Sequence, residues 1–571
     1  MGGRSLKAAN SAPPSRGRLR RWLRRLLLVA IAFALLLAGF VGWAFATCFA
    51  TPPVLTRRPA LLGERPHRGP TDRLQLGPSW FERRPYASRA CFAGDPVELG
   101  FANATLTSDL LEAQEQSLFD TVEKAIPSAP MRWALAFAVL VNNRSLPDYV
   151  PEEYRREILG LSLADAGVDH YTVYGSRYHR ILNYHAAHDI SHWVWDQPAI
   201  GCTAFAASGA HTSDGHLLVG RNFDWEAGEH FDRNKVIALF QPQQGHAFLS
   251  VVWPGMAGAV TGLNDSRLFC SINGAHSSAR ANIGRPVSLV VRQVLQYATS
   301  VAEAERIVRE APVFVADSFL VADGKTGEAV VIEKTPAHTA VRSAHDGLLL
   351  QSNHFESADF ADDAGNAAYR RDGSSEARHQ RLAELLLDRS APLDPAAVVA
   401  ILRDRLGPGA TPRALGHRGT LNADIATHSV VADVTAGVLW VSTGPHQVGA
   451  YEAFAIEGFP AAAAPPIARD AIASDGTLPR LAEQRRRLAL VQDRQRRAGA
   501  STDDVDELQA ARQDNPGEPE TLLLLASTLE RLHRVDEAAE CYAAALAAAP
   551  PYRPQRDEAA AGLQRTRGGK Q

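Results

Sequence analysis

Cysteine is scarce in this sequence, and the few cysteines stand far apart. The 571 residues include five of them, at positions 48, 91, 202, 270 and 541, and no two have the CxxC spacing. So few and so scattered, they exclude a disulfide scaffold. The missing CxxC pair also means that neither a structural zinc site nor a thioredoxin-like redox motif is indicated.

Concentrated positive charge and nucleotide-binding motifs are also missing. The net charge is −3, whereas a nucleic-acid-binding protein needs a concentrated basic face. The sequence has no Walker A loop, no GxGxxG fingerprint and no GxSxG elbow. Nucleotide use and serine hydrolase chemistry therefore have no support. We predict no nucleic-acid partner, no cofactor and no metal.

The composition is that of a globular protein with more than one folded unit. Hydrophobic residues make up 46% of the chain and charged residues 22%. Single hydrophobic cores stop growing beyond about 250–300 residues, so a chain of 571 residues predicts two or three folded units.

An apolar run near the N-terminus predicts a membrane anchor. Residues 16–25 hold six arginines, and an almost purely apolar run over residues 26–46 follows. As a helix, this run is long enough to cross the core of a bilayer. Because basic flanks stay on the cytoplasmic side, residues 1–25 are predicted to be cytoplasmic. The rest of the chain, after the transmembrane segment 26–46, is predicted to be periplasmic or extracellular.

Two other interpretations of this segment stay open. Ala44-Phe45-Ala46 resembles the cleavage site of a signal peptide, and Cys48 raises a lipoprotein alternative. The long basic lead and the full-length apolar run favour a retained anchor. All three interpretations place the body of the protein outside the cytoplasm.

Changes in composition divide the rest of the chain. Residues 47–80 are rich in proline and predict a linker, residues 81–201 predict helices, and the alanine- and proline-rich residues 460–479 predict a second linker. Between them, residues 202–459 alternate blocks of strands with blocks of helices, which indicates α+β packing. Strands are predicted at 202–207, 216–222, 236–240, 247–253, 268–272, 318–322, 329–333, 429–434 and 438–442, and helices at 287–310, 376–387 and 395–406.

The C-terminal residues 480–571 predict a helical tail. One copy of a tetratricopeptide-like pattern fits residues 519–552, with small alanines where two helices would cross closely. Because at least three such repeats are needed for a stable solenoid, we interpret the tail as a capping module or a surface that docks a protein partner.

The pair Gly201-Cys202 opens an apolar strand and predicts a reactive centre. If the bond between them were cut, Cys202 would become a new N-terminus whose α-amine titrates at about pH 7.7–8.0, close to neutrality. Nucleophile and general base would then belong to one residue, as in N-terminal nucleophile chemistry. This interpretation predicts an inactive precursor that matures by cutting itself.

Six short motifs follow one another in a consistent order. They are Gly201-Cys202-Thr203, Gly220-Arg221-Asn222-Phe223-Asp224, Ser271-Ile272-Asn273, Ser352-Asn353-His354-Phe355, Ser375-Glu376-Ala377-Arg378 and Thr427-His428-Ser429. With these motifs, residues 170–445 resemble the penicillin acyltransferase branch of the N-terminal nucleophile hydrolases, which is related to bile salt hydrolase and acid ceramidase. The resemblance implies an αββα sandwich. It also implies a true prosegment before Cys202, as in acid ceramidase and penicillin acyltransferase.

The resemblance also implies roles for single residues. Cys202 corresponds to the nucleophile, whose reactive form is the thiolate. Arg221 would lower the pKa of this thiol, and Asp224 would stay ionised and hold the α-ammonium or orient the substrate.

Three further residues complete the implied site. Asn273 and Asn353 match the oxyanion hole, where fixed donors stabilise the charge on a carbonyl oxygen. Arg378 matches a supporting arginine, although Arg381 lies one helical turn away and is an alternative for this role.

Other candidates have ordinary explanations. His185, His188 and His192 have helical spacing, but no carboxylate or cysteine completes a metal site, so a structural role is predicted. The sequons at Asn103 and Asn143 matter only in a eukaryotic host.

The sequence therefore predicts a membrane-anchored, self-processing cysteine amidohydrolase or acyltransferase. Its substrate would be a small, linear, non-peptide amide, cleaved through a thioester acyl-enzyme, with water or an acceptor amine completing the reaction. Phe205, Phe223 and Trp225 indicate either a hydrophobic acyl group or part of the core. The alternative is a non-catalytic, surface-anchored interaction protein that uses its helical tail to dock a partner.

Overall fold

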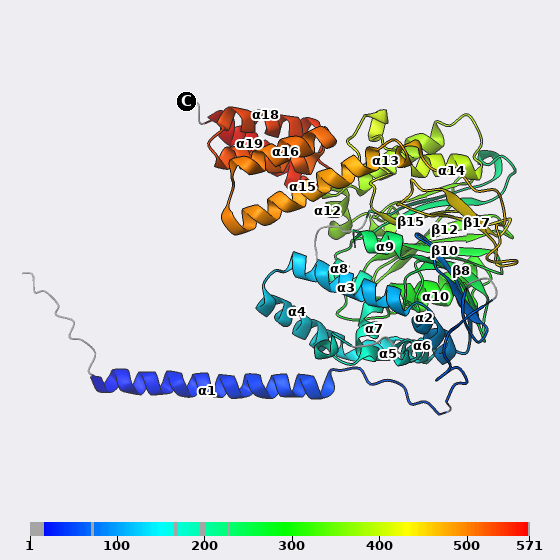
Figure 1. Ribbon diagram of the computed structural model, residues 1–571, viewed down its shortest axis with the longest axis horizontal. Coiled ribbons are helices and arrows are strands. Elements are labelled where there is room, and N and C mark those ends of the chain that lie inside the picture. Colours follow the sequence, from blue (N-terminus) through cyan, green and yellow to red (C-terminus); the bar gives the residue numbers. More distant parts are fainter. Residues whose placement is uncertain are drawn as a thin grey trace, which may run out of the picture.

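Two β-sheets packed face to face form the centre of the fold (Figure 1). The structure, a computed structural model, describes residues 16–56, 58–69, 73–164, 169–194, 201–226 and 228–568. Alternate residues of both sheets, such as Val219 and Leu320, are buried between the sheets. Helices cover the outer face of each sheet. The predicted α+β class is confirmed, and its layers have the order αββα.

The smaller sheet has six strands, and all its neighbours pair antiparallel. In spatial order they are β14 (Leu348–Gln351), β5 (Thr203–Ala207), β6 (Leu218–Asp224), β15 (Ala426–Asp433), β16 (Val438–Ser442) and β17 (Tyr451–Phe454). Helices α13 and α14 cover its outer face, where Phe205 and Leu218 pack against Leu382 and Val398. The sequence segments 202–207 and 216–222 therefore form two neighbouring inner strands of this sheet.

The larger sheet has eleven strands and extends far beyond the predicted ones. In spatial order they are β1 (His67–Arg68), β2 (Leu74–Leu76), β3 (Ser79–Glu82), β4 (Ser88–Gly94), β7 (Val236–Pro242), β8 (Phe248–Val252), β9 (Thr261–Asn264), β10 (Leu268–Gly274), β11 (Asp317–Asp323), β12 (Glu328–Lys334) and β13 (Thr339–Ser343). The pair β4 and β7 is parallel, whereas the other neighbours are antiparallel. Residues before Cys202 thus supply four of these strands.

That N-terminal part of the sheet corrects two predictions. The segment predicted as a linker, 47–80, contains β1, β2 and the start of β3, and the segment predicted as helical from residue 81 begins with strands up to Gly94. Proline and glycine residues interrupt these short strands, so the sequence does not show the alternation of apolar and polar residues that predicts a strand. Burial explains why the strands form, because Phe81 and Phe92 enter the main core.

The nine strands predicted between residues 202 and 442 are confirmed, with shifted ends. The strands β9, β13, β14 and β17 were not predicted, because each is short and lacks a distinct alternating pattern. The helix predicted over 287–310 is two helices, since Ser300 accepts a hydrogen bond from the Glu303 N–H and caps the second one. The helices predicted at 376–387 and 395–406 are confirmed, although the second ends at Leu402.

Helices fill the sequence before, between and after the strands. Before Cys202 these are α2 (Pro96–Leu106), α3 (Ser108–Ala125), α4 (Ala129–Asn142), α5 (Leu146–Tyr149), α6 (Glu152–Leu163), α7 (Arg177–His185) and α8 (Ala187–Val194). Between the strands lie α9 (Glu229–Arg233), α10 (Val287–Tyr297), α11 (Val301–Glu310), α12 (Ala364–Asp372), α13 (Ser375–Leu387) and α14 (Pro395–Leu402). The tail holds α15 (Thr477–Ala498), α16 (Thr502–Asp514), α17 (Pro519–Arg531), α18 (Val535–Ala547) and α19 (Arg553–Gly568).

The tail is helical, as predicted, and it lies against the αββα layers. Asn515 exchanges two hydrogen bonds with the Leu415 backbone, at 3.2 and 3.0 Å. His417 Nε2 lies 3.1 Å from the Ala549 carbonyl oxygen, and Arg556 donates to the Arg371 carbonyl at 3.0 Å. The tail therefore covers the segment that leads into β15.

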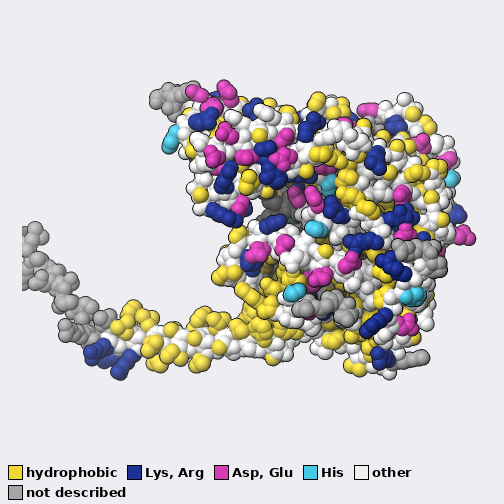
Figure 2. Space-filling view, viewed as in Figure 1, with side chains coloured by type: hydrophobic (Ala, Val, Ile, Leu, Met, Phe, Trp, Pro, Cys, Tyr) yellow, Lys and Arg dark blue, Asp and Glu magenta, His cyan; other side chains and the backbone are white. Residues whose placement is uncertain are grey.

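The N-terminal helix α1 (Arg16–Thr47) extends away from the body (Figure 1). Its part Arg20–Thr47 is long and apolar enough to cross a membrane, with a mean hydropathy of 2.6, and its most apolar window is not buried. A span and a signal sequence share these properties. The C-terminal end of α1 touches the body, where Ala44 and Cys48 pack against Leu140 of α4. Figure 2 shows hydrophobic side chains along α1 that continue onto the body where the two meet.

Helices α2 and α6 cross at two glycines, and this contact makes the crossing sensitive to a single methyl group. A Cβ atom at Gly100 would lie 1.9 Å from the Glu157 carbonyl oxygen, and one at Gly160 would lie 2.1 Å from the Val97 carbonyl oxygen. Both neighbours are backbone atoms, so only a movement of the whole helix could relieve the clash.

We therefore predict that Gly100→Ala lowers the free energy of unfolding by about 1–3 kcal/mol, the usual cost of overpacking. Urea denaturation of the full chain in detergent, followed by tryptophan fluorescence, measures this loss. Gly568→Ala is the control, since a Cβ there meets nothing within 4 Å. Equal unfolding midpoints for the two variants would show that the crossing tolerates a methyl group.

Candidate active site

Cys202 lies directly before β5, beside the end of β6. The last pair between these strands is Thr203 with Asn222, so Cys202 and Phe223 face each other one position further on. The Cys202 Sγ lies 3.8 Å from the Asp224 carbonyl oxygen, and the Gly201 N–H donates to the same oxygen at 3.0 Å. The strand end therefore fixes the Gly201–Cys202 junction, and Cys202 is fully buried there.

Arg378, near the start of α13, connects the cysteine to the oxyanion candidates. Its guanidinium donates to the Cys202 carbonyl, to Thr203 Oγ1 at 2.9 Å and to Asn353 Oδ1 at 2.7 Å. Arg381, the alternative, points elsewhere and pairs with Asp404 at 2.9 Å. Arg378 is thus the arginine that the fold brings to this site.

The two asparagines lie at strand ends of opposite sheets. Asn273 is on β10 of the larger sheet, and its amide donates to the Ser352 carbonyl at 3.3 Å. Asn353 follows β14 of the smaller sheet and donates to the Gly274 carbonyl at 2.8 Å. The side chains therefore join both sheets next to Arg378, and the Asn273 Oδ1 has no hydrogen-bond partner among the described residues.

Arg221 is a fully buried cation on the same face of β6 as Phe223. It donates to the carbonyls of Val260, at 2.9 Å, and of Ile272, and its guanidinium lies 4.8 Å from the centre of the Phe223 ring. Burial lowers the pKa of Arg221 to about 10, which still leaves it positively charged at neutral pH.

Asp224 is buried without a hydrogen-bond partner for its carboxylate. Among the described residues nothing bonds either oxygen, and the junction lies close by, since a Cβ at Gly201 would lie 3.8 Å from Asp224 Oδ2. Burial raises the pKa of this carboxyl to about 7, although Arg378 and more distant cations oppose the rise. In the uncut chain Asp224 is therefore only partly ionised at neutral pH, less than the neighbouring arginine led us to expect.

The thiol of Cys202 also departs from expectation. Burial raises its pKa to about 12, and the lowering by Arg221 is smaller than this rise. In the uncut chain the predicted activation of the thiol by Arg221 is thus outweighed. The thiol is protonated there, and the thiolate that would attack a substrate does not form at neutral pH.

Two polar residues at the site received no role from the sequence. Ser375 Oγ accepts from the Asn353 N–H at 2.8 Å, and His428 Nε2 lies 2.8 Å from Thr261 Oγ1 and 3.4 Å from Arg221. Both residues belong to motifs that carried the resemblance, so the sequence did mark them as candidates for the site. Their contacts could not be predicted, because each joins segments far apart in the sequence.

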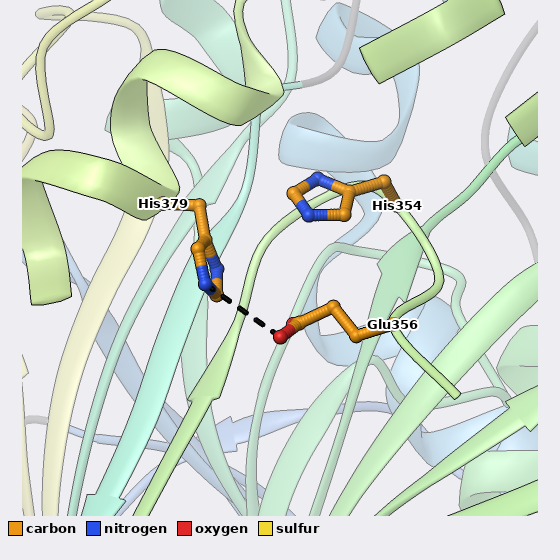
Figure 3. Close-up of side chains that lie close together, drawn as sticks. All are labelled: His354, Glu356 and His379. Carbon is orange, nitrogen blue, oxygen red and sulfur yellow. Dashed lines mark ion pairs between the residues drawn. The ribbon is translucent and has the colours of Figure 1, made fainter. Parts of the chain in front are cut away.

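A group of possible metal ligands lies beside Asn353. The ligand atoms of His354, Glu356 and His379 lie within 4.8 Å of one another, and Figure 3 shows the three side chains facing one another. Arg342 already donates to Glu356 at 2.8 Å, and His354 Nδ1 lies 2.8 Å from Ser375 Oγ. Burial, with smaller contributions from nearby arginines, lowers the pKa of His354 to about 2, so its imidazole is neutral at pH 7.

The predicted histidine group is structural where the structure describes it. His185 Nε2 accepts from the Ala257 N–H at 2.8 Å, and its Nδ1 lies 2.8 Å from the Ile181 carbonyl oxygen. His188 lies with its ring stacked 6.4 Å from that of Phe223. The side chain of His192 lies outside the described residues.

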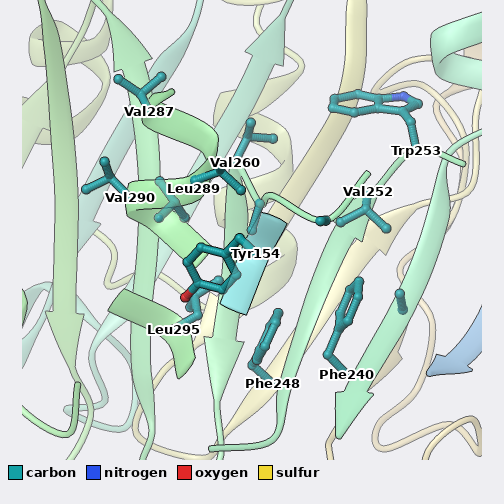
Figure 4. Close-up of a cluster of buried hydrophobic side chains, with 14 of the residues drawn as sticks. Tyr154, Phe240, Phe248, Val252, Trp253, Val260, Val287, Leu289, Val290 and Leu295 are labelled. Carbon is teal, nitrogen blue, oxygen red and sulfur yellow. The ribbon is translucent and has the colours of Figure 1, made fainter. Parts of the chain in front are cut away.

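An apolar cavity of about 100 Å³ lies beside Phe223, the residue that faces Cys202 one position beyond the last strand pair. Phe223, Trp225 and Trp253 line it from the sheets, and Val260 lines it at the edge of the core cluster in Figure 4. Phe205 is on the opposite face of the smaller sheet and belongs to the core under α13 and α14. Of the three aromatic residues proposed for an acyl group, only Phe223 and Trp225 are therefore in a position to contact one.

Curated relatives match about two fifths of the chain. An uncharacterized protein of Archaeoglobus fulgidus is 28% identical over 268 residues, which are 44% of this chain and 44% of that protein. Protein dcd1B of Dictyostelium discoideum is 24% identical over 246 residues, 38% of this chain and 44% of its own. The chain thus spans less than half the length of these relatives.

Several solved structures are also similar. A Caenorhabditis elegans N-acylethanolamine-hydrolyzing acid amidase ortholog is 18% identical, with a TM-score of 0.31, over 41% of this chain and 93% of its own. A mutant of conjugated bile acid hydrolase from Clostridium perfringens is 17% identical, with a TM-score of 0.33, over 45% and 92%. Penicillin V acylase from Agrobacterium tumefaciens is 14% identical, with a TM-score of 0.28, over 43% and 83%.

A family match covers the central part of the chain. Residues 211–425 match the family described as acyl-coenzyme A:6-aminopenicillanic acid acyl-transferase. This range includes Arg221, Asp224 and Arg378 and both asparagines, and it begins shortly after Cys202. The match confirms the resemblance that the motifs predicted for the central part of the chain.

Proposed function

We propose that this chain is a self-processing cysteine amidohydrolase or acyltransferase with Cys202 as its nucleophile. The observation that carries the proposal is the unpartnered carboxylate of Asp224, buried beside the Gly201–Cys202 junction. A buried carboxylate without a partner is costly. Cleavage of the junction would supply that partner, because the new α-ammonium of Cys202 would form beside Asp224.

The cutting step uses the residues at the junction. Asp224 accepts the proton of the Cys202 thiol, and Sγ attacks the carbonyl carbon of Gly201. The C–N bond breaks as the amide nitrogen takes up the proton, which leaves a thioester between Gly201 and Sγ. Water then hydrolyses this thioester, releasing the Gly201 carboxylate and restoring the thiol. Arg378 holds the Cys202 carbonyl throughout.

In the mature enzyme the α-amine of Cys202 replaces Asp224 as the base. The amine accepts the thiol proton, Sγ attacks the amide carbonyl of the substrate, and donors at Asn273 and Asn353 stabilise the oxyanion. The ammonium protonates the leaving amine, so a thioester acyl-enzyme remains. Water as the acceptor gives hydrolysis and an amine gives acyl transfer, and both follow from the same thioester.

The residues before Cys202 form, in this proposal, a prosegment that stays bound after cleavage. Strand β4 pairs with β7 along its whole length, and Phe92 packs 5.5 Å from Phe240 between ring centres. Leaving the body would expose this sheet edge and the core beneath α2 and α6. The smaller fragment therefore remains part of the enzyme.

Membrane attachment and the tail complete the proposal. Helix α1 would hold the body outside the cytoplasm, and α17 and α18 form the hairpin to which the tetratricopeptide-like pattern was assigned. The non-catalytic alternative has weaker support, because the tail covers the hydrolase layers through Asn515, His417 and Arg556 instead of standing apart from them.

Self-processing is tested by replacing the nucleophile. We expect the wild-type chain to separate into residues 1–201 and 202–571, and Cys202→Ala to stay whole, because no other atom can form the thioester. N-terminal sequencing and intact mass measure the products. Cys91→Ala, which removes another buried cysteine, should be cut like the wild type. A folded wild-type chain that stays whole would refute the proposal.

The oxyanion role is tested at Asn353. We expect Asn353→Ala to lower kcat for a chromogenic amide by about a hundredfold to a thousandfold, the usual cost of losing one donor. Asn264→Ala is the matched control, because this buried amide bonds the Leu295 and Ala298 carbonyls away from the site. The folded fraction of Asn264→Ala should keep the kcat of the wild type. An equal loss of kcat in both variants would contradict a specific role of Asn353.

The unpartnered carboxylate predicts a pH dependence of stability in uncut protein. Asp224 titrates near pH 7 when folded, and an unfolded aspartate titrates at about 3.9. Between these values the folded state binds the extra proton, so stability falls as pH rises from about 4 to about 7, by at most about 1.4 kcal/mol per unit. We therefore expect the free energy of unfolding of the uncut Cys202→Ala variant to fall as the pH rises from about 4 to about 7. The double variant Cys202→Ala, Asp224→Asn lacks the titrating carboxyl and should not show this fall. Urea titrations at several pH values measure the difference, and a constant difference would contradict the assignment.

A further inference from the structure

Three side chains with metal-binding atoms come together beside Asn353. His354 and Glu356 lie on the segment that follows β14, and His379 lies on α13. Their ligand atoms lie within 4.8 Å of one another, and Figure 3 shows the side chains facing one another. His379 Nε2 is 3.6 Å from Glu356 Oε2. Ligand atoms around a four-coordinate zinc ion lie about 3.3 Å apart, so side-chain movements of about 1 Å would complete this arrangement.

The two histidines carry ring nitrogens that bond to nothing. The His354 side chain is fully buried, and its Nε2 has no hydrogen-bond partner among the described residues. The Nδ1 of His379 is also buried and has no partner in the same part of the chain. Burial of a polar atom without a partner costs free energy, and a bound ligand would offset this cost. A ring nitrogen that meets no donor keeps its lone pair for a metal ion.

Two of the three ligands are oriented by hydrogen bonds on their far side. His354 Nδ1 lies 2.8 Å from Ser375 Oγ, so a proton on Nδ1 leaves Nε2 as the free acceptor. Arg342 donates to Glu356 Oε1 at 2.8 Å, which leaves Oε2 facing His379. Histidines and carboxylates that bind metals almost always have such partners, because these fix the direction of the ligand atom.

The charges around the group are largely balanced. Three arginines lie close enough to affect His354, and two of them are bonded to glutamates. Arg342 pairs with Glu356 at 2.8 Å, and Arg370 pairs with Glu376 at 2.7 Å. Glu376 Oε2 also lies 3.8 Å from His354 Nε2. Most of the local positive charge is therefore neutralised, and a further carboxylate lies next to the group.

We propose that His354, Glu356 and His379 form a binding site for a divalent transition-metal ion of the zinc type. Two imidazoles and one carboxylate are a ligand set found in zinc proteins, and imidazole disfavours hard ions such as Mg²⁺. Water or Glu376 would take the fourth position. The sequence alone predicted no metal, because the three ligands come from two separate segments without a recognisable spacing.

The ion would connect the two segments that carry Asn353 and Arg378. His354 follows Asn353 directly in the chain, and His379 follows Arg378. Ser375 Oγ, which contacts His354, also accepts from the Asn353 N–H at 2.8 Å. An ion bound to both histidines therefore fixes the segment after β14 to α13, next to the hydrogen bond from Arg378 to Asn353. The role of the ion is structural, and it takes no part in bond cleavage.

The test measures metal binding by the full-length, uncut Cys202→Ala variant in detergent, which lacks the Cys202 thiol as a competing ligand. Isothermal titration with Zn²⁺ should give one tight site per chain. We expect His379→Ala and Glu356→Gln to weaken the affinity by about a hundredfold or more, because even an outer hydrogen-bond partner of a metal ligand is worth about 10–100-fold. Titration with Mg²⁺ should show no such site.

The matched control is another group of possible ligands among the described residues, formed by Asp214, His216 and Asp433. There His216 Nδ1 already bonds Asp433 at 2.9 Å, so we expect His216→Ala to leave the zinc affinity unchanged. Zinc should raise the urea midpoint of Cys202→Ala alone and of its combination with His216→Ala. It should not raise the midpoint once His379→Ala is added, because an ion that binds only the folded state stabilises only a chain that has the site.

These outcomes decide the inference independently of the proposed function, because no turnover is measured. A chain without a stoichiometric zinc site would overturn it, as would an unchanged affinity in His379→Ala and Glu356→Gln or an equal rise of the urea midpoint with Mg²⁺. Loss of the site in His216→Ala would also overturn it, since the ion would then belong to the other group. If His379→Ala shows no cooperative unfolding, Glu356→Gln decides, because it keeps the size of the side chain.

Discussion

Desolvation of charged groups at the end of β6 is the constraint on which the rest of the site depends. One buried ion pair elsewhere is fully bonded: Arg292 forms two bonds with Glu157, at 3.1 and 3.2 Å, and its guanidinium stacks 4.9 Å from two phenylalanine rings. Asp224 has no such pairing, although Arg221 and Arg378 are close enough to affect its pKa. Both arginines are committed to backbone carbonyls and to Asn353 instead. An unpaired carboxylate in a well-packed interior lowers the stability of the folded state. Such costly groups occur most often at functional sites.

The same constraint gives the uncut chain its proposed inactivity. Burial keeps the Cys202 thiol protonated, with a pKa of about 12, and raises the pKa of Asp224 to about 7, so the carboxylate that would accept the thiol proton is only partly ionised at neutral pH. An α-ammonium next to Asp224 would reverse both effects, because a nearby positive charge favours carboxylate and thiolate alike. The precursor and the mature enzyme would then differ by one broken bond and one new charge, with the same positions for Arg221, Arg378 and the asparagines.

The central strands could be predicted from the sequence because their residues alternate or form short apolar runs. The order of motifs likewise predicted which residues meet, and the fold brings Arg378, and not Arg381, to Cys202. The strands before residue 94 could not be predicted, since their burial depends on pairing with β7, more than a hundred residues away. The expected directions of the pKa shifts of Cys202 and Asp224 were not met, for a related reason. A sequence shows that Arg221 and Asp224 are near in the chain, but the extent of burial is a property of both sheets and outweighs the neighbouring charge.

The structure also assigns different origins to the two halves of the site. The polar half comes from strand ends after residue 200 and from α13, which are the segments that carry the family motifs. The apolar half depends on α3, α7 and α8, which precede Cys202 and lie outside the family match. Segments that share the family pattern can therefore keep the geometry of amide cleavage while the preceding helices determine which acyl group fits. Residues of α3, α7 and α8 also line a groove together with residues of α1, so the helices that shape the cavity would lie nearest the membrane in the proposed anchored enzyme.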